Sequence, residues 1–424
     1  MRTLTRLIYD DMRPALGVTE PGAIAFAVAS AKEHVRGELQ QIRVVLNSGM
    51  YKNAFTCGIP NSREQGNEYA AALGYVSATP SRGLECLDSV SLSDNRRAKE
   101  IVRAKQVQVQ VGQISSRIYI HVEITTSEGS ASVTIEDSHT NITKITENGN
   151  VVYEKDATSH VSASVESKPL IHRYTLRQLI RYVESVPVEE IQFIQRAYDI
   201  NMALFHQALS SKRTTLTHYL FEKNGCEVIS ENEQLTASLL CNAAIEARVL
   251  GFSHPAMSIT GSGAHGIIAT LPLYGVQHIN HYADERLLRA TALSYLVCMY
   301  IKEYSGRLSA FCGCAIAAGT GMACGLAWMK GGHCKELTLV IRNMASSITG
   351  MICDGGNHGC TLKGIVAVDA AFHSVSMALS GIAISSRHGI NGKTPEETMR
   401  NMGQIASPGM IRTEDVIMDI LQRK

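Results

Sequence analysis

An excess of charge of either sign is absent from this sequence. Its 40 lysine and arginine residues are matched by 39 aspartate and glutamate residues, which leaves a formal net charge of +1 on 424 residues. This balance provides no basic field for nucleic acid and no polybasic patch for a membrane surface. We therefore expect neither nucleic acid nor a membrane among the partners.

The N-terminal residues 1–11 lack the apolar core of a signal peptide. The 11 cysteines are an odd number, and without a secretory signal they fit a reducing compartment better than a disulfide framework. The cytoplasm is the expected location. Internal repeats, low-complexity tracts and long linkers are also absent. A hydrophobic content of 45% with 19% charged residues is typical of a globular protein with a sizeable core.

One stretch, from Leu308 to Met329, carries no charged residue. Its length would suffice to span a bilayer. It consists largely of Ala, Gly, Cys and Thr, however, with few large apolar side chains and no flanking aromatic belts. We therefore expect a central helix of a helical domain, in which small residues let neighbouring helices approach closely.

The first part of the chain combines helix and strand patterns. A helix is expected to begin at Thr19, a good N-cap, and to run toward Lys32. An apolar strand follows at residues 42–46, and a loop rich in Asn and Gly at 47–53. Residues 68–73 then form a second helix.

Residues 106–153 change to a period of two. Valines and isoleucines alternate there with polar residues, which is typical of half-buried antiparallel strands. Glu128-Gly129 and Asn148-Gly149 supply hairpin turns. An antiparallel meander is the simplest topology.

After about residue 165 the pattern becomes helical, and Thr175 can cap a helix that starts at Leu176. The expected fold class is therefore α+β. An N-terminal α+β domain with antiparallel strands would occupy residues 1–165, and a larger, mostly helical domain that contains Cys312, Cys353 and Cys360 would occupy residues 166–424.

Three cysteines, Cys312, Cys353 and Cys360, stand in glycine- and alanine-rich surroundings where thiols have no packing reason to gather. A set of three suits an iron–sulfur cluster with one iron left open, since thiolates are the usual cluster ligands. An open iron is a Lewis acid that can hold a leaving group. The alternative is that the three are buried thiols acting as small hydrophobes. The polar neighbours Asp354 and His358 favour the cluster.

Residues 261–266 match the dinucleotide fingerprint G-x-G-x-x-G, and Asp284 lies near the expected ribose-binding offset. That fingerprint requires a preceding strand and a βαβ unit. Here Pro255 precedes it and the neighbourhood has a helical pattern. We expect instead a loop facing the substrate or the cluster, where glycine lets the backbone approach closely and Ser262 is a candidate binding residue.

Two further segments could form a substrate site. Residues 137–141 end a strand pattern, and His139 is a candidate general base there, beside Ser138. A turn capped by Asx and Ser/Thr side chains is the alternative. Thr19 and Glu20 start a helix whose first N–H groups could bind a carboxylate, although an ordinary capped helix would have the same sequence.

Taken together, these motifs resemble the L-cysteine desulfidase family, of the UPF0597 type, whose helical half is similar to the α part of iron–sulfur L-serine dehydratases. The matches extend through most of the chain, and the cysteine-bearing motifs are the most specific. They comprise residues 17–21, Lys52-Asn53, residues 58–60, residues 139–142, residues 261–263, residues 308–312, Cys353-Asp354-Gly355, Cys360 and Lys363.

The resemblance implies a [4Fe–4S] cluster held by Cys312, Cys353 and Cys360, with Cys314 not a ligand. It also implies elimination of sulfide from L-cysteine, after which aminoacrylate hydrolyses to pyruvate and ammonia. The expected partners are a small amino-acid substrate and, for assembly, a second copy of the chain in a homodimer.

Two positions depart from the family pattern. Val18 stands where many members carry a cysteine that is a candidate acid/base, and Ala264 stands where asparagine usually follows Gly-Ser-Gly. Both changes remove polar groups from the expected substrate site. They leave the cluster inference intact and the identity of the substrate open.

The expected mechanism has the open iron binding the β-leaving group, with the N-terminal region facing the cysteines across a cleft. Thr19 and its helix N-terminus would hold the carboxylate, Asn53 and Asn61 would orient the substrate, and His139 would remove the α-proton. The remaining candidate binding residues are Glu20, Ser138 and Ser262.

Two other functions stay open at this point. An L-serine dehydratase, or a lyase for another small β-substituted amino acid, would use the same cluster. A non-catalytic iron–sulfur or amino-acid-binding protein that kept the scaffold and lost activity would be consistent with Val18.

Overall fold

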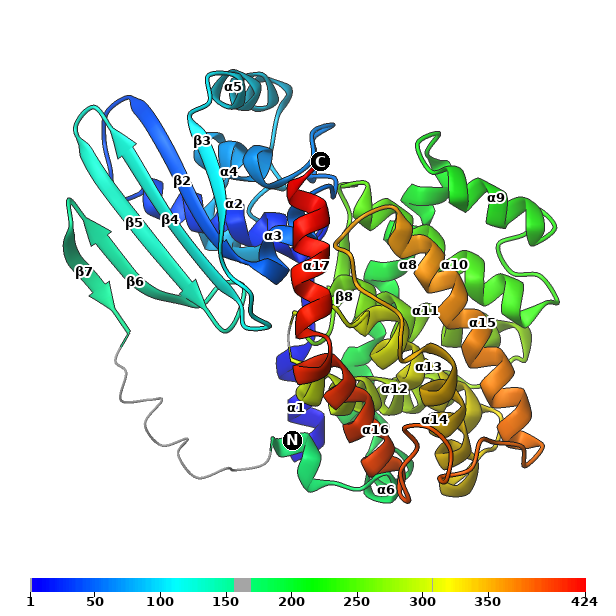
Figure 1. Cartoon of the computed structure of the whole chain (residues 1–424). Coiled ribbons are helices and arrows are strands. Elements are labelled where there is room, and N and C mark those ends of the chain that lie inside the picture. The colour runs from blue at the N-terminus through cyan, green and yellow to red at the C-terminus, as the bar shows by residue number, and fades with distance from the viewer. Residues whose placement is uncertain (1, 156–168, 307) are drawn as a thin grey trace.

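The computed structural model describes residues 2–155, 169–306 and 308–424. A sheet with its helices lies beside a larger group of packed helices, so the expected α+β class is confirmed (Figure 1). The expected domain boundary at 165/166 falls within 156–168, outside the described residues. The division into two domains therefore stays a prediction.

The sheet region is formed by five helices and seven strands. In chain order these are α1 (Thr3–Asp11), β1 (Arg13–Leu16), α2 (Thr19–Lys32), β2 (Leu39–Asn47), α3 (Ser48–Ala54), α4 (Asn67–Val76), α5 (Leu92–Arg103), β3 (Val107–Gln113), β4 (Tyr119–Thr126), β5 (Gly129–Glu136), β6 (Ile142–Glu147) and β7 (Asn150–Glu154).

The helical region follows residue 169 and contains one short strand. Its elements are α6 (Leu176–Ser185), α7 (Val188–Ile191), α8 (Gln195–Ser210), α9 (Thr215–Lys223), α10 (Glu233–Val249), β8 (Pro255–Ser258), α11 (Gly263–Ile279), α12 (Asp284–Ser305), α13 (Gly319–Met329), α14 (Cys334–Ile348), α15 (Gly359–Leu379), α16 (Pro395–Gln404) and α17 (Ile411–Gln422).

The larger sheet has the strand order β3-β2-β4-β5-β6-β7. Strands β4 to β7 form the expected antiparallel meander. The expectation is wrong for β3, which pairs in parallel with β2 rather than joining the meander. A period of two indicates which side chains share a face but not which strand is the neighbour. Helix α5 lies between β2 and β3 in the chain and belongs to the long connection that a parallel pair requires.

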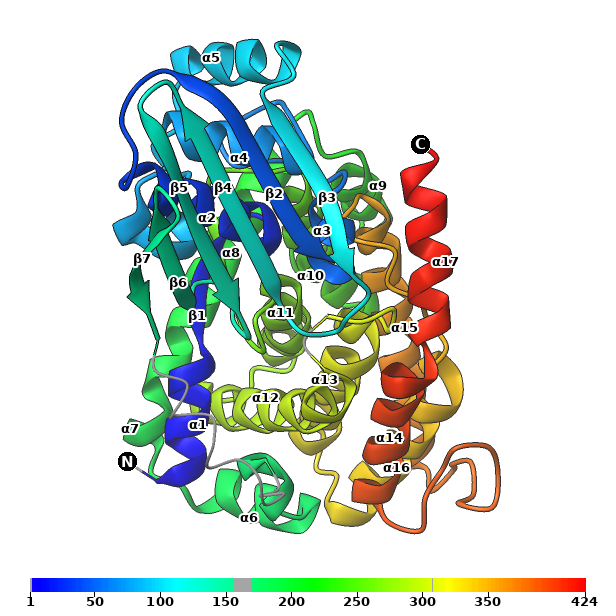
Figure 2. The same ribbon diagram turned by 60° about the vertical axis from the view of Figure 1, so that its left-hand side comes forward.

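One face of this sheet is buried. Ile42, Val44 and Leu46 of β2 are fully buried, and the matching side chains of β4 and β5 extend the same apolar layer. Helix α2 contacts both β4 and β5 and covers this layer, while α4 packs on α2 (Figure 2). Because α2 is buried on almost every side, its N-terminus is held firmly at the edge of the sheet region.

Residues 48–54 form helix α3, where the sequence predicted a loop. The polar residues that suggested a loop make tertiary hydrogen bonds instead. The Asn47 side chain donates through Nδ2 to the Ser115 carbonyl oxygen at 2.8 Å and accepts at Oδ1 from the Tyr119 N–H at 3.0 Å. These bonds attach the start of α3 to the β3–β4 connection.

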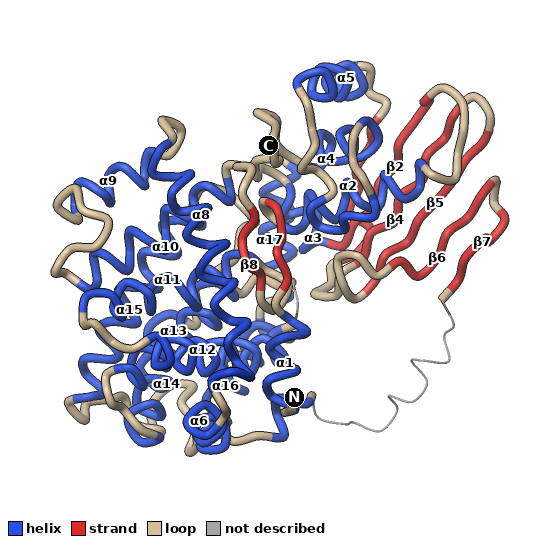
Figure 3. Tube along the Cα trace, turned by 180° about the vertical axis from the view of Figure 1, so that it is seen from behind, coloured by secondary structure: helices blue, strands red, loops and turns tan. Residues whose placement is uncertain are grey.

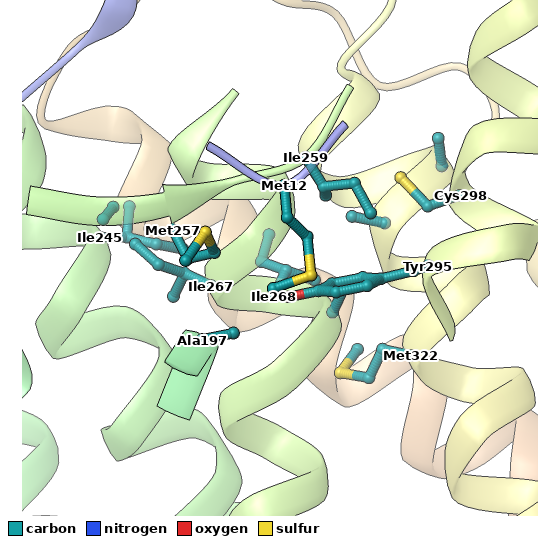
Figure 4. Close-up of a cluster of buried hydrophobic side chains, with 14 of the residues drawn as sticks. Met12, Ala197, Ile245, Met257, Ile259, Ile267, Ile268, Tyr295, Cys298 and Met322 are labelled. Carbon is teal, nitrogen blue, oxygen red and sulfur yellow. The ribbon is translucent and has the colours of Figure 1, made fainter. Parts of the chain in front are cut away.

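The N-terminal segment joins the sheet region to the helical region. Strand β1 pairs antiparallel with β8, and the two strands lie side by side between the regions (Figure 3). Met12 lies beside Ile268 and Tyr295 in a buried apolar cluster (Figure 4). One continuous core therefore connects both regions, which fixes their relative position.

The uncharged stretch is not a single helix. Residues 308–312 are not helical, and within them Phe311 forms an isolated antiparallel bridge with Ile352. A π-helical turn, Cys314–Ala318, then leads into α13. The expected central helix is thus correct only from Cys314 onward, because the preceding residues pair with another segment of the chain.

Within the described ranges, α15 is the one helix whose length and composition would allow it to cross a membrane. It packs against α10, α13 and α14, and 39% of its most apolar window is buried in the protein. A single helix of this kind also occurs in the cores of soluble proteins, so it is weak evidence for a membrane span.

Candidate functional site

Two backbone segments bring the cysteines together. The Cys312 N–H donates to the Met351 carbonyl oxygen at 3.0 Å, and the Cys353 N–H donates to the Ala310 carbonyl oxygen at 2.7 Å. Cys360 follows after a short loop, in the first turn of α15. Its thiol donates to the Gly355 carbonyl oxygen at 3.4 Å, which turns it back toward the loop that carries Cys353.

The three thiols influence one another electrostatically. Burial raises the pKa of Cys353 and raises that of Cys360 to about 12, and in both cases the charge of the neighbouring cysteines adds to the rise. A hydrogen bond to Cys314, together with burial, raises the pKa of Cys312. Because their pKa values are raised, the three thiols stay protonated until a positive charge compensates them.

Such a donor set fits an iron–sulfur cluster, because iron supplies the positive charge that stabilises thiolates. In the described part of the chain, no group of three or more His, Cys, Asp or Glu side chains is positioned to hold a single metal ion. A cluster makes a different demand, since each thiolate binds its own iron and the sulfur atoms stand apart. Cys312, Cys353 and Cys360 are the residues that would hold it.

Four polar residues lie beside the Cys353 loop and are called the polar wall below: Thr19, Glu20, Asn53 and His139, with Glu20 at the centre. The Glu20 carboxylate accepts from Thr19 Oγ1 at 2.9 Å and from Asn53 Nδ2 at 2.9 Å. His139 Nε2 is buried 3.7 Å from Glu20 Oε1 and has no hydrogen-bond partner in the described part of the chain. Burial alone would raise the pKa of Glu20, but His139, Asn53 and Arg248 lower it to about 2, so the carboxylate is ionised at neutral pH.

The polar wall contacts the cysteine loop directly. Asn53 Oδ1 lies 3.9 Å from Cys353 Sγ, and the Asn53 carbonyl oxygen accepts from the Gly356 N–H at 3.2 Å. A Cβ on Gly356 would stand 2.9 Å from Val18 Cγ1, so glycine allows the loop to approach the start of α2. The structure therefore brings Thr19, Glu20, Asn53 and His139 next to Cys353.

Other predicted residues lie elsewhere or play structural parts. Asn61 donates to the Leu87 and Asp88 carbonyl oxygens and lines a separate cavity of about 850 Å³, which none of the other predicted site residues lines. Ser138 is exposed on the β5–β6 loop. Ser262 is the N-cap of α11, and its loop reaches the site through Thr19 Oγ1, which lies 3.3 Å from the Gly261 carbonyl oxygen.

A short strand, β8, does precede the glycine-rich loop, although Pro255 had argued against one. It pairs antiparallel with β1 rather than forming part of a βαβ unit. The dinucleotide fold that the fingerprint requires is therefore absent from the described residues around it. The glycines serve close packing instead, since a Cβ on Gly266 would clash with the Met257 carbonyl oxygen.

Several buried polar residues near the site were missed in the sequence. Lys52 forms a buried ion pair with Glu414 of α17 at 2.6 Å, and its charge acts on the Cys353 thiol. His265 is buried against Gly313, the residue after Cys312, and burial together with the charges of Lys302 and Arg248 lowers its pKa well below the usual value.

Helix α10 supplies two more charged residues, Glu246 and Arg248. Glu246 accepts from the Thr217 backbone N–H at 2.7 Å and pairs with His358 Nε2 at 2.6 Å, which anchors the loop between Cys353 and Cys360. The sequence could have indicated both residues as candidates for the site, because they are the charged residues in the otherwise uncharged stretch from residue 235 to 249.

The Glu20 environment predicts a specific acid sensitivity. Its pKa is about 2 in the folded protein and 4.5 in an ordinary environment, so its ionised form stabilises the fold above about pH 4.5. That stabilisation, about 3 kcal/mol, should be lost as the pH falls from 4.5 toward 2. Denaturant unfolding as a function of pH should show this fall in the parent and a smaller one in Glu20→Gln. The exposed substitution Glu222→Gln is the control, and an unchanged pH profile in Glu20→Gln would contradict the assignment.

The described chain is thus an α+β protein in which the sheet region brings a carboxylate, an amide and an imidazole to the loop that carries Cys353, with Cys312 and Cys360 on the adjoining segments. It belongs to the UPF0597 family and matches the family model described as serine dehydratase alpha chain over residues 81–419. The resemblance to the UPF0597 family and to the serine dehydratase alpha chain is therefore confirmed.

Relatives extend along the whole chain. A UPF0597 protein of Clostridium botulinum strain Langeland is 40% identical over 423 residues, which cover 99% of this chain and 98% of the relative. UPF0597 proteins of Caldanaerobacter subterraneus and Elusimicrobium minutum are 34% and 33% identical, covering 99% and 100% of this chain and 98% and 100% of the relatives.

Proposed function

We propose that this protein is an iron–sulfur-dependent lyase that catalyses β-elimination from a small L-amino acid, with L-cysteine as the preferred substrate. The single observation that carries the proposal is the contact between Asn53 and Cys353. It joins a buried carboxylate–imidazole pair to a set of three thiols. Elimination needs both parts, because one must take the α-proton and the other must hold the leaving group.

When bound by Cys312, Cys353 and Cys360, the cluster supplies a Lewis-acidic iron for the β-substituent. His139 takes the α-proton on Nδ1, because its Nε2 is buried and faces the Glu20 carboxylate. That carboxylate stabilises the imidazolium that forms. The proton ends on His139, the electron pair of the C–H bond forms the new double bond, and sulfide leaves with the electrons of the C–S bond.

Asn53 and Thr19 position the carboxylate of Glu20. Asn53 donates to Oε1 and Thr19 to Oε2, so both oxygens are fixed before the substrate arrives. This preorganisation keeps the imidazole in one orientation and avoids reorganisation during proton transfer.

The family description favours one competitor, an L-serine dehydratase. Protein loaded with iron and sulfide under anaerobic conditions should be given L-cysteine and L-serine separately, with pyruvate, ammonia and sulfide measured. We expect faster pyruvate formation from L-cysteine, accompanied by equimolar sulfide. Faster turnover of L-serine would assign the dehydratase, and no turnover of either by cluster-loaded protein would support the non-catalytic alternative.

Val18 gives a second test of the substrate. Its side chain is buried at the N-cap of α2, next to Gly356 of the cysteine loop. Val18→Cys is close to isosteric and places a thiol at a helix N-terminus, where the dipole lowers thiol pKa. We expect kcat with L-cysteine to rise about tenfold, because a titratable group would then assist His139. Val18→Ser is the matched control, and equal activity of the two variants would show that the thiol has no catalytic part.

A further inference from the structure

Arg248 is a buried cation without an ionic partner. It lies at the end of α10 with 5% of its surface exposed, and its Nε is buried without a hydrogen-bond partner. No carboxylate of the described residues forms an ion pair with it. A buried charge without a partner is strongly unfavourable, so this site is suited to an anion that the free protein does not supply.

Glu20 is not the anionic partner of Arg248. It lies within electrostatic range of Arg248, but hydrogen bonds from Thr19 and Asn53 hold its two oxygens, and the two side chains form no ion pair. The same carboxylate stands in the first turn of α2, where it already compensates that helix N-terminus. A substrate carboxylate at the start of α2 would therefore meet a like charge.

The N-terminus of α11 lies against Arg248. A Cβ on Gly263 would stand 2.7 Å from Arg248 Nε, so the guanidinium packs on the first residue of this 17-residue helix. The N-cap residue, Ser262, makes no side-chain cap hydrogen bond. The guanidinium thus lies beside the first N–H groups of α11, and both favour an anion.

We propose that Arg248 and the N-terminus of α11 bind the α-carboxylate of the amino acid. This inference rests on the proposed function and moves the carboxylate from Thr19 to the glycine-rich loop. The loop is joined to the polar wall through Thr19 Oγ1 and the Gly261 carbonyl oxygen. A guanidinium can form two parallel hydrogen bonds with a carboxylate, so the site selects amino acids over the corresponding amines.

The test measures binding rather than turnover. L-alanine has no β-leaving group, and ethylamine is the same molecule without its carboxylate. Calorimetry on the anaerobically loaded protein should show L-alanine binding at least about 30-fold more tightly than ethylamine. Arg248→Gln should abolish this preference, and Arg248→Lys should retain part of it, since lysine keeps the charge but not the planar fork.

Gly263→Ala provides a second variant, because its methyl group would displace the guanidinium without changing any charge. It should weaken L-alanine binding and leave ethylamine binding unchanged. Arg342→Gln is the matched control. Arg342 of α14 is another part-buried arginine with a buried Nε that has no partner among the described residues, but its Nη2 donates to the Gly392 and Lys393 carbonyl oxygens. It should keep the full preference.

The outcomes separate the two proposals. A parent that does not distinguish L-alanine from ethylamine, or folded Arg248→Gln and Gly263→Ala variants that keep the full preference, would overturn the carboxylate site even if elimination occurs. An Arg248-dependent preference in a protein that eliminates from no amino acid would overturn the proposed function and leave the carboxylate site standing.

Discussion

Cys353→Ala is expected to abolish iron–sulfur binding and, with it, elimination. Cys353 is the central thiol, because its backbone is bonded to Ala310 near Cys312 and its side chain meets Asn53 of the polar wall. Losing one of three thiolates should lower activity by more than about 100-fold, since even outer partners of metal ligands cost 10–100-fold. The absorption spectrum after anaerobic reconstitution, with iron and sulfide counted per chain, measures the loss directly.

Cys314→Ala is the control for this prediction. Cys314 is close to Cys312, but it begins a π-helical turn and does not belong to the segment that bridges to the Cys353 loop. We expect this variant to keep its iron and sulfide content. Full iron content in Cys353→Ala, or its loss in Cys314→Ala with retention in Cys353→Ala, would show that the ligand set is assigned wrongly.

His139→Ala should lower kcat by about 10²- to 10⁴-fold, the range that general acid–base groups contribute. The reason is geometric, because the buried Nε2 faces the ionised Glu20 carboxylate and has no structural hydrogen bond to maintain. The cluster spectrum should stay intact, since His139 comes from the β5–β6 loop and not from the cysteine segments. Steady-state assays with the best substrate, alongside spectra of the same preparations, would separate the two effects.

His121→Ala is the matched histidine control. His121 is half-buried on β4, where its Nδ1 lies 3.0 Å from Thr134 Oγ1 within the sheet. We expect its substitution to leave kcat unchanged. Robust turnover in His139→Ala would mean that another group removes the α-proton, even if the class of reaction is correct.

The sequence predicted local features of the fold more accurately than contacts between distant segments. Periodicity and capping predicted individual elements well. Thr175 caps α6 with Gln178 in a reciprocal capping box, as expected. Helix α2 does start at Thr19, but the predicted cap is wrong, because Val18 is the N-cap and Thr19 is the first helical residue. These features are local, because a cap or an apolar stripe is settled by residues within one or two turns.

The sequence did not predict which strands and segments pair with one another. The parallel pairing of β3 with β2 and the formation of α3 depend on contacts between segments far apart in the chain, such as those of Asn47 with Ser115 and Tyr119. Local patterns contain no information on these partners. An Asn-rich segment therefore looked like a loop although its polar groups are satisfied by tertiary hydrogen bonds.

By itself, the sequence determined the fold class, the family and the candidate cysteines, because composition, periodicity and motif spacing are properties of the chain alone. Only the tertiary structure decided which polar residues stand beside them. It separated Asn61 from the group and brought Glu20, His139 and Asn53 to the Cys353 loop. It also showed that Arg248 is a buried charge without an ionic partner among the described residues. Burial and the absence of a counter-ion exist only once distant segments are packed together, and they govern the electrostatics of the site.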